Sequence, residues 1–430
     1  MKLSLYGRLA MALFASLALG LGMTACGGGT VGYLWILGQE AAGQASGQIV
    51  GFKIDDFTGN LTQTARFSET TNGTYPVSLV VKSGGRFVYV INQGSAPAGG
   101  LGSGPNVGAG ISIFAVGGDG SLTFENSTTS SGFDPVWAQM DNSGTYLFVL
   151  DKYSPESATT NVACLTAKPQ NCYGSITVFS ADPNTGRLTK IQNTQTIPQN
   201  GQPVTYFNVG TTPLMTSTEG SCLITLNSDN TISPYLIAGS TGQLSFTGPN
   251  TQKPVPSLGT LTSLNSINGN GSLVFLTDGV NNIIYPFNLT TSNCNLAIAN
   301  GGGLPNYDGA TTPVYTIVDS SNKYLYVLNQ SSTTTAQGTP FSSITGFNLV
   351  PGQNGQLQQM SNGQFTTGAG PVCMVEDPTH KYMYVSNHND GTVTGKVFDP
   401  NTGQLSALTR GSTFAAAGQA ACLVVSGAVD

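Results

Sequence analysis

Histidine and carboxylate side chains are the first candidates for chemistry, because the chain has only two histidines. His388 follows Asn387 and lies two residues before Asp390 in the stretch YMYVSNHNDG. A histidine near a carboxylate can act as a general base or a general acid, which makes His388 and Asp390 the catalytic candidates. His380 lies in the turn sequence DPTHK, and we expect it to be inert.

A second set of polar residues recurs where strand-like runs end. Each residue closes a run of the Tyr-Val-Tyr-Val type: Asn92, Asp151, Asn227, Asp278, Asn329 and Asn387. Asn and Asp favour such places because their side chains bond to nearby backbone amides in turns, and we expect most of the set to do so. Lys152 is the only cation that directly follows one of these runs. The candidates for ligand binding are therefore Asn92, Asp151, Lys152, Asp278, Asn329 and Asn387.

The sequence predicts no metal site and no cofactor. Six cysteines follow Cys26, but no two have the C-x-x-C spacing, and neither histidine completes a zinc-binding pattern. The chain also lacks a G-x-S-x-G nucleophile elbow and a paired-histidine metal motif. The Gly-rich segment 99–110 lacks the Gly-Lys-Ser/Thr ending of a phosphate-binding loop.

The first 26 residues stand apart from the rest. A short basic start precedes an apolar run over 9–21 that is too short to cross a bilayer, so 1–25 is predicted to be a signal peptide. The segment resembles a bacterial lipoprotein signal, which implies cleavage before Cys26 and acyl chains on that residue. We therefore expect an exported protein, anchored to a membrane of the bacterial cell envelope in the periplasm or at the outer membrane. The Gly-rich segment 26–32 is the expected tether.

Charge is sparse along the chain. The 15 basic and 21 acidic residues give a net charge of −6, and the basic residues do not cluster. A nucleic-acid partner is therefore not expected. Apart from the membrane, the expected partner is an unknown protein, glycan or small molecule, and the chain is expected to act as a monomer.

One unit of sequence occurs seven times, with strand-like runs that begin at 33, 87, 146, 222, 273, 324 and 382. Each copy continues with an extended run such as ISIF, a turn, a Gly-x-Leu start to another run, and a final run that often begins with Pro. Four short strands per copy predict one antiparallel sheet per copy. Seven sheets in a ring make an all-β, seven-bladed β-propeller over 33–430. The last strand, within 419–430, is predicted to pair with the N-terminal blade and close the ring.

The repeat resembles the YVTN-repeat propellers of the lactonase family, whose best-known type is a bacterial 6-phosphogluconolactonase. The likeness rests on the Tyr-Val-x-Asn run, the Ile-x-x-Phe run and the Thr-Gly-x-Leu turn, and it covers about residues 33–427. It implies the propeller fold and a lactone hydrolase. A phosphosugar substrate needs cations for its phosphate. The mature chain has four arginines, all expected away from the ligand face: Arg66, Arg86, Arg187 and Arg410.

Two functions therefore remain open from the sequence. Long uncharged loops favour a binding or interaction module at the cell envelope. The alternative is a lactonase-like hydrolase that opens a neutral lactone ring at the mouth of the central channel.

Export permits disulfides. Cys164 and Cys172 lie in one polar loop and are predicted to pair. For the other four cysteines the pairing is open, with Cys222–Cys294 and Cys373–Cys422 as cross-blade options. Cys373 and Cys422 hold equivalent positions in adjacent blades, so a bridge between them needs local distortion.

Overall fold

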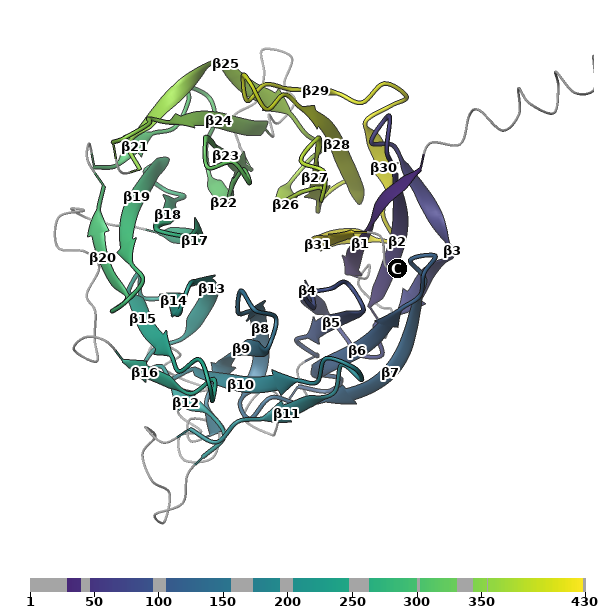
Figure 1. Ribbon diagram of the computed structural model, residues 1–430, viewed down its shortest axis with the longest axis vertical. Coiled ribbons are helices and arrows are strands. Elements are labelled where there is room, and N and C mark those ends of the chain that lie inside the picture. Colours follow the sequence, from purple (N-terminus) through teal and green to yellow (C-terminus); the bar gives the residue numbers. More distant parts are fainter. Residues whose placement is uncertain are drawn as a thin grey trace, which may run out of the picture.

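The computed structural model describes residues 29–39, 47–95, 106–155, 173–193, 204–246, 263–299, 302–330, 343–353 and 355–427. Within these residues, antiparallel strands form seven sheets that stand as blades around a central channel (Figure 1). The predicted signal peptide, Cys26, Cys164 and Cys172 lie outside the described residues. No helix in the described part of the chain is long and apolar enough to span a membrane.

From the channel outward, blade 1 consists of β31 (Gln419–Gly427), β1 (Thr30–Gln39), β2 (Gln48–Asp55) and β3 (Leu61–Thr70). Blade 2 consists of β4 (Pro76–Val81), β5 (Phe87–Asn92), β6 (Gly110–Val116) and β7 (Leu122–Thr128). Blade 3 consists of β8 (Phe133–Met140), β9 (Tyr146–Tyr153), β10 (Ser175–Ala181) and β11 (Leu188–Lys190), and β12 (Phe207–Asn208) also pairs with β10. Blade 4 consists of β13 (Pro213–Glu219), β14 (Cys222–Asn227), β15 (Ile232–Ile237) and β16 (Leu244–Phe246).

Blade 5 consists of β17 (Leu264–Asn270), β18 (Leu273–Asp278), β19 (Ile283–Thr290) and β20 (Asn295–Ile298), and β21 (Leu304–Pro305) also pairs with β19. Blade 6 consists of β22 (Pro313–Val318), β23 (Tyr324–Asn329), β24 (Ser343–Leu349) and β25 (Leu357–Thr366). Blade 7 consists of β26 (Pro371–Glu376), β27 (Tyr382–Asn387), β28 (Thr392–Phe398) and β29 (Leu405–Ala407), and β30 (Thr413–Ala415) also pairs with β28.

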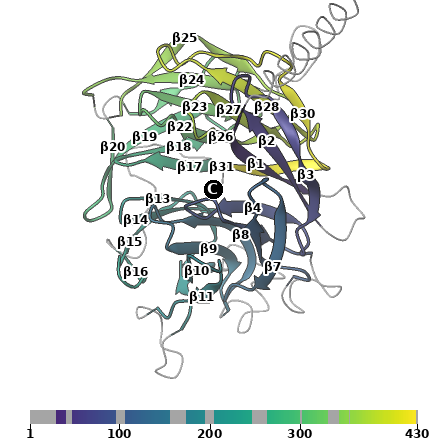
Figure 2. The ribbon, with the colours of Figure 1, turned by 45° about the vertical axis from the view of Figure 1, so that its right-hand side comes forward.

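The predicted ring closure is confirmed, because the C-terminal strand β31 is the innermost strand of blade 1 and pairs antiparallel with β1. The two strands lie side by side (Figure 2). β1 begins at Thr30, three residues before the predicted start of the propeller. The all-β, seven-bladed fold follows from strands such as β5, whose six residues are all buried between neighbouring blades.

The connections of each blade emerge on two faces. We call the side with the first-to-second and third-to-fourth strand hairpins the hairpin face. The other side, the loop face, carries the second-to-third connections and the links between blades. Because β1 runs antiparallel to β31, the chain enters at the hairpin face, where the Asp56 amide donates to the Gly29 carbonyl oxygen at 2.9 Å.

The repeated aromatic and glycine positions meet across the seams between blades. A Cβ atom added at Gly186 would lie 2.4 Å from the Phe87 ring, and Gly186 has a φ of 65° that also favours glycine. Four other seams show the same close approach, in the pairs Tyr33/Gly120, Tyr146/Gly242, Tyr324/Gly403 and Tyr382/Gly59. We call this contact between an aromatic ring and a glycine of the next blade the lock. A residue larger than glycine at this position would push the two blades apart.

Cys222 and Cys294 replace this lock between blades 4 and 5. Cys222 begins β14 where five other blades place an aromatic residue, and Cys294 takes the glycine position with a φ of 56°. The two cysteines form a disulfide. A covalent bond thus stands where five seams have ring-to-glycine packing and where the seam between blades 5 and 6 has Leu273 against Gly355.

Cys373 and Cys422 also form a disulfide, which joins the inner strands of blades 7 and 1. A register shift lies beside each of these cysteines, but the same shift recurs in the inner strands of blades 2 to 6, so it belongs to the repeat and is not a distortion specific to this bridge. The bridge therefore spans the seam where the two ends of the described chain meet.

Two aromatic residues of the inner strands contact more than one blade. Trp137 of β8 and Tyr315 of β22 both pack against the cluster that holds Cys373 and Cys422 and against the cluster that holds Cys222. Both are partly buried. A cavity of about 380 Å³ remains beside them, with a mostly aliphatic lining that includes Val80, Val81, Ile317, Val375, Val424 and Val425.

Candidate functional site

The predicted ring of Asn and Asp residues lies inside the blades and not around the channel. The six side chains that end the second strands are at most 1% exposed: Asn92, Asp151, Asn227, Asp278, Asn329 and Asn387. Inner strands separate them from the channel, so the fold does not bring them together. The sequence placed them correctly at strand ends, but it could not show that another strand covers each one.

Most of these residues bond to hydroxyl groups on the third strand of their own blade. Asn92 Nδ2 donates to Ser112 Oγ at 3.0 Å, and Asn387 Nδ2 donates to Thr394 Oγ1 at 2.9 Å. Asn329 makes the same kind of bond to Thr345. Asp278 alone of this set matches the expected turn pattern, because it accepts from the amides of its own turn. A binding role for the set remains a prediction.

His388 and Asp390 both lie on the loop face, but the structure describes no bond between them. His388 Nδ1 lies 3.0 Å from the Ala420 carbonyl oxygen of the next blade. Gln39 and Gln330, which hold the same place in their blades, bond to the Pro76 and Pro371 carbonyl oxygens in the same way. His388 therefore makes a repeated link between blades, and its catalytic role remains a prediction.

Asp390 is exposed and holds the loop that precedes β26. Its carboxylate accepts from the Ala369 amide at 2.8 Å and from Thr392 Oγ1 at 2.7 Å. These contacts give Asp390 a role in the loop structure. Among the described residues, no group of three His, Cys, Asp or Glu side chains is placed to hold a metal ion.

Among the described residues of the loop face, Asp134 near the start of β8 is a carboxyl group in a different situation. Its side chain is 4% exposed, and no residue that the structure describes donates a hydrogen bond to its carboxylate. Burial raises the pKa of Asp134 to about 6, although the positive charge of Lys152 opposes the shift. Its backbone φ of 54° is one that residues other than glycine rarely adopt.

The segment before Asp134 is held by a second buried carboxylate, Asp151 of β9. Asp151 accepts from Ser130 Oγ, from Thr177 Oγ1 at 3.0 Å and from the Gly132 amide at 3.2 Å. Burial raises the pKa of Asp151 to about 7, although these bonds oppose the shift. Asp151 therefore positions the chain that carries Asp134.

Two lysines complete this cluster of ionisable residues in blade 3. Lys190 Nζ donates to the Ser130 carbonyl oxygen at 3.1 Å. Lys152 is half-buried, with Nζ 5.4 Å from the centre of the Tyr153 ring. Of the four ionisable residues, sequence analysis identified Asp151 and Lys152 and missed Asp134 and Lys190.

Asp134 lines a cavity of about 290 Å³ at the seam between blades 2 and 3, which we call the Asp134 cavity. The blade 2 side is formed by Asn106, Ala109 and Gly110, and the blade 3 side by residues 129–135. Asn106 Oδ1 is buried and has no described hydrogen-bond partner. The cavity thus presents two acceptor groups, one of which can take up a proton near neutral pH.

A signal for Asp134 was present in the repeat. Five inner strands have Pro at or near their start, and Tyr75 and Thr312 precede this Pro in blades 2 and 6 with a positive φ like that of Asp134. Asp134 is the carboxyl group at this position. The sequence alone could not show that the position is covered and lines a cavity.

Comparisons with known proteins agree with this fold. The family model described as "Lactonase, 7-bladed beta-propeller" matches residues 35–168. The inferred resemblance to the lactonase-type propellers is confirmed. A comparison with curated proteins gives no match.

Solved structures of similar proteins cover nearly the whole chain. The periplasmic gluconolactonase of Pseudomonas aeruginosa is 16% identical with a TM-score of 0.65, and the match covers 92% of this chain and 99% of that one. A protein of Bacteroides fragilis, provisionally described as a 6-phosphogluconolactonase, is 17% identical with a TM-score of 0.64, and the match covers 92% and 98%. At this level of identity the likeness shows the fold alone.

Proposed function

We propose that the protein hydrolyses a neutral lactone in the Asp134 cavity. The single observation that carries this proposal is a buried carboxyl group that faces a cavity without a described hydrogen-bond donor and has a pKa of about 6. A general base is most effective when its pKa lies near the working pH. The resemblance to lactonase propellers and the gluconolactonase of similar fold favour the same chemistry.

The reaction follows from the position of the carboxylate. Asp134 accepts a proton from water while the water oxygen attacks the lactone carbonyl carbon. The ring C–O bond then breaks, and Asp134 returns the proton to the leaving ring oxygen. The Lys152 ammonium group, which is close enough to affect the Asp134 pKa, favours the negative charge that develops on the carbonyl oxygen.

The test is hydrolysis of glucono-δ-lactone, measured above the spontaneous rate by titration of the acid formed. We expect the rate to rise with pH through about 6 and then level off, because only the carboxylate form of Asp134 accepts a proton. Asp134→Asn should lower kcat by about 10²–10⁴-fold.

A matched control is Asp308→Asn, which changes an exposed carboxyl group between blades 5 and 6. This variant should keep the wild-type rate. Turnover that survives in Asp134→Asn would show that another group is the base, and absence of turnover in the wild type would reject the lactonase proposal.

Binding without hydrolysis is the alternative function. It is favoured by a second cavity beside the Asp134 cavity, whose described lining carries no charged residue. A propeller that only binds should retain its ligand unchanged, with the same affinity in the wild type and in Asp134→Asn.

Export and a lipid anchor on Cys26 are part of the proposal. Disulfides such as Cys222–Cys294 persist in oxidising compartments outside the cytosol. Because the described chain begins at the hairpin face, an anchor would turn that face toward the membrane and leave the Asp134 cavity open to the other side. Cys26→Ala should move the protein from the membrane to the soluble fraction, and retention in the membrane would argue against the anchor.

A further inference from the structure

A second cavity adjoins the Asp134 cavity at the loop-face end of blade 2. Its volume is about 350 Å³, and its described lining consists of amides, hydroxyls and small apolar groups, with Asn72, Asn92, Ser112 and Ser127 as the main polar residues. We call it the Asn92 cavity. The described lining holds no cation for a phosphate or carboxylate, so a neutral ligand fits it best.

Asn92 gives this cavity an unused hydrogen-bond acceptor. The side chain is 1% exposed, Nδ2 donates to Ser112 Oγ, and Oδ1 has no described partner. A buried acceptor without a donor is costly, and a ligand hydroxyl group could supply the missing donor. Asn227 of blade 4 has the same bond and the same unpaired oxygen, but it lines none of the cavities described above.

The two cavities share one low wall. Ala109, Gly110 and Thr129 line both of them. Gly110 has no side chain, and an added Cβ would lie 2.9 Å from the Thr128 carbonyl oxygen, so the backbone itself forms the wall. A ligand longer than one sugar ring could therefore occupy both cavities by passing over this wall.

We infer that the Asn92 cavity binds a neutral sugar ring joined to the lactone in the Asp134 cavity. The substrate class is then the lactone of a disaccharide aldonic acid. The sugar hydroxyls donate to Asn92 Oδ1 and exchange hydrogen bonds with Ser127 and Thr129. This inference rests on the proposed lactonase function for its reacting part, whereas the sugar site itself can be tested without any reaction.

The kinetic experiment compares glucono-δ-lactone with the lactone of cellobionic acid on the mature chain. We expect the KM for the disaccharide lactone to be about tenfold lower, the effect of one or two additional hydrogen bonds. Ser127→Tyr places a bulky ring at an exposed strand position that lines only the Asn92 cavity, and it should remove most of this preference.

Asn227→Ala is the control for Asn92→Ala, since each loses a bond to a serine hydroxyl and Asn227 also loses one to Thr231 Oγ1. Asn227→Ala should lose at least as much stability, but only Asn92→Ala should lose the preference for the disaccharide lactone. Equal KM values for the two lactones in the wild type would overturn the sugar site and leave the lactonase proposal standing.

Cellobiose, which has no lactone, separates binding from hydrolysis. Calorimetry should show that it binds to the wild type and to Asn227→Ala, and that Ser127→Tyr weakens this binding about tenfold. Binding with this pattern in a protein that hydrolyses neither lactone would support the sugar site and reject the lactonase function. No binding of cellobiose and no preference between the lactones would overturn the sugar site.

Discussion

The hairpin face and the loop face both hold buried carboxylates at the ends of inner strands, but in opposite surroundings. Asp377 follows β26 on the hairpin face and is 1% exposed, while Asp134 lies near the start of β8 on the loop face and is 4% exposed. Asp377 accepts four hydrogen bonds from its own turn, whereas no described residue donates to the Asp134 carboxylate. Although the two side chains are similarly buried, the Asp377 carboxylate accepts several hydrogen bonds and the Asp134 carboxylate has no described donor.

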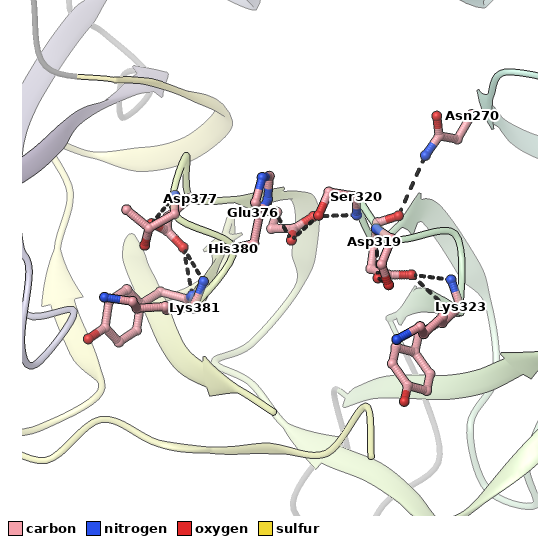
Figure 3. Close-up of polar contacts among 12 residues, drawn as sticks. Asn270, Asp319, Ser320, Lys323, Glu376, Asp377, His380 and Lys381 are labelled. Atoms are coloured by element: carbon pink, nitrogen blue, oxygen red, sulfur yellow. Dashed lines mark hydrogen bonds and ion pairs between the residues drawn. The ribbon is translucent and has the colours of Figure 1, made fainter. Parts of the chain in front are cut away.

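The hairpin-face contacts are repeated from blade to blade. Asp319 accepts from the Ser321, Lys323 and Tyr324 amides just as Asp377 accepts from its turn, and Figure 3 shows the two turns side by side. Between them, Glu376 accepts from the Ser320 amide at 2.8 Å and lies 3.0 Å from His380 Nδ1 (Figure 3). The bonds between Ser320 and Glu376 join the turns of blades 6 and 7, whereas His380 contacts Glu376 within its own turn.

The repeated Asp turns of the hairpin face stabilise charge. Hydrogen bonds lower the pKa of Asp55, chiefly from the Thr58 hydroxyl, and the pKa of Asp182, chiefly from the Thr185 amide. Burial has the opposite effect on both faces: it raises the pKa of Asp134 and Asp151 on the loop face, and of Glu219 on the hairpin face to about 7. Asp134 differs from Glu219 in its partners, because Glu219 accepts from the Ser217 hydroxyl and the Gly271 amide.

The largest expected effect on stability comes from the hairpin face. Asp377→Ala leaves the Thr379, Lys381 and Tyr382 amides without their acceptor, and should lower the free energy of unfolding by about 3 kcal/mol. Denaturant unfolding measures the change. Lactone hydrolysis per folded molecule should stay at the wild-type value, and Asp319→Ala should behave alike. A loss of lactone hydrolysis larger than the loss of folded protein would contradict the expectation that Asp377 stabilises the fold and takes no part in hydrolysis.

Asp134→Asn should act in the opposite direction on stability. The folded pKa of about 6 lies above the ordinary value of 3.8, so the folded state favours the protonated acid, and wild-type stability falls as pH rises between these values. The Asn variant should therefore be more stable than the wild type at pH 8, on the order of 2 kcal/mol, and similar to it at pH 4. Thermal unfolding at the two pH values provides the measurement. Equal stability at both would mean that Asp134 is solvated, which would weaken its case as the base.

The smallest effect is expected at His388. His388→Gln restores the residue type that Gln39 and Gln330 place at the same position, so the bond to the Ala420 carbonyl oxygen can re-form. Stability should change by less than about 0.5 kcal/mol, as for most surface substitutions, and hydrolysis should not change. Loss of hydrolysis in this variant would restore His388 as the catalytic candidate and displace Asp134.

The two described disulfides show what the sequence repeat could and could not indicate about cysteine pairing. The sequence left the pairing of Cys222 with Cys294 open, because the contact between the aromatic and glycine positions of neighbouring blades is visible only in the structure. The pairing of Cys373 with Cys422 was open as well, and the structure shows that their Cα atoms lie 5.2 Å apart. Spacing along one strand does not report how closely two strands of different blades approach each other.

The sequence by itself determined the seven-bladed architecture and the closure by the C-terminal strand, because repeated strand and turn positions report local geometry directly. The tertiary structure alone decided which polar residues are accessible. It covered the predicted Asn and Asp ring with inner strands, placed Trp137 and Tyr315 in the lining of one cavity, and placed Asp134 in the lining of another. The physical reason is that burial and missing hydrogen-bond partners depend on contacts between residues far apart in the chain, which spacing along one strand does not encode.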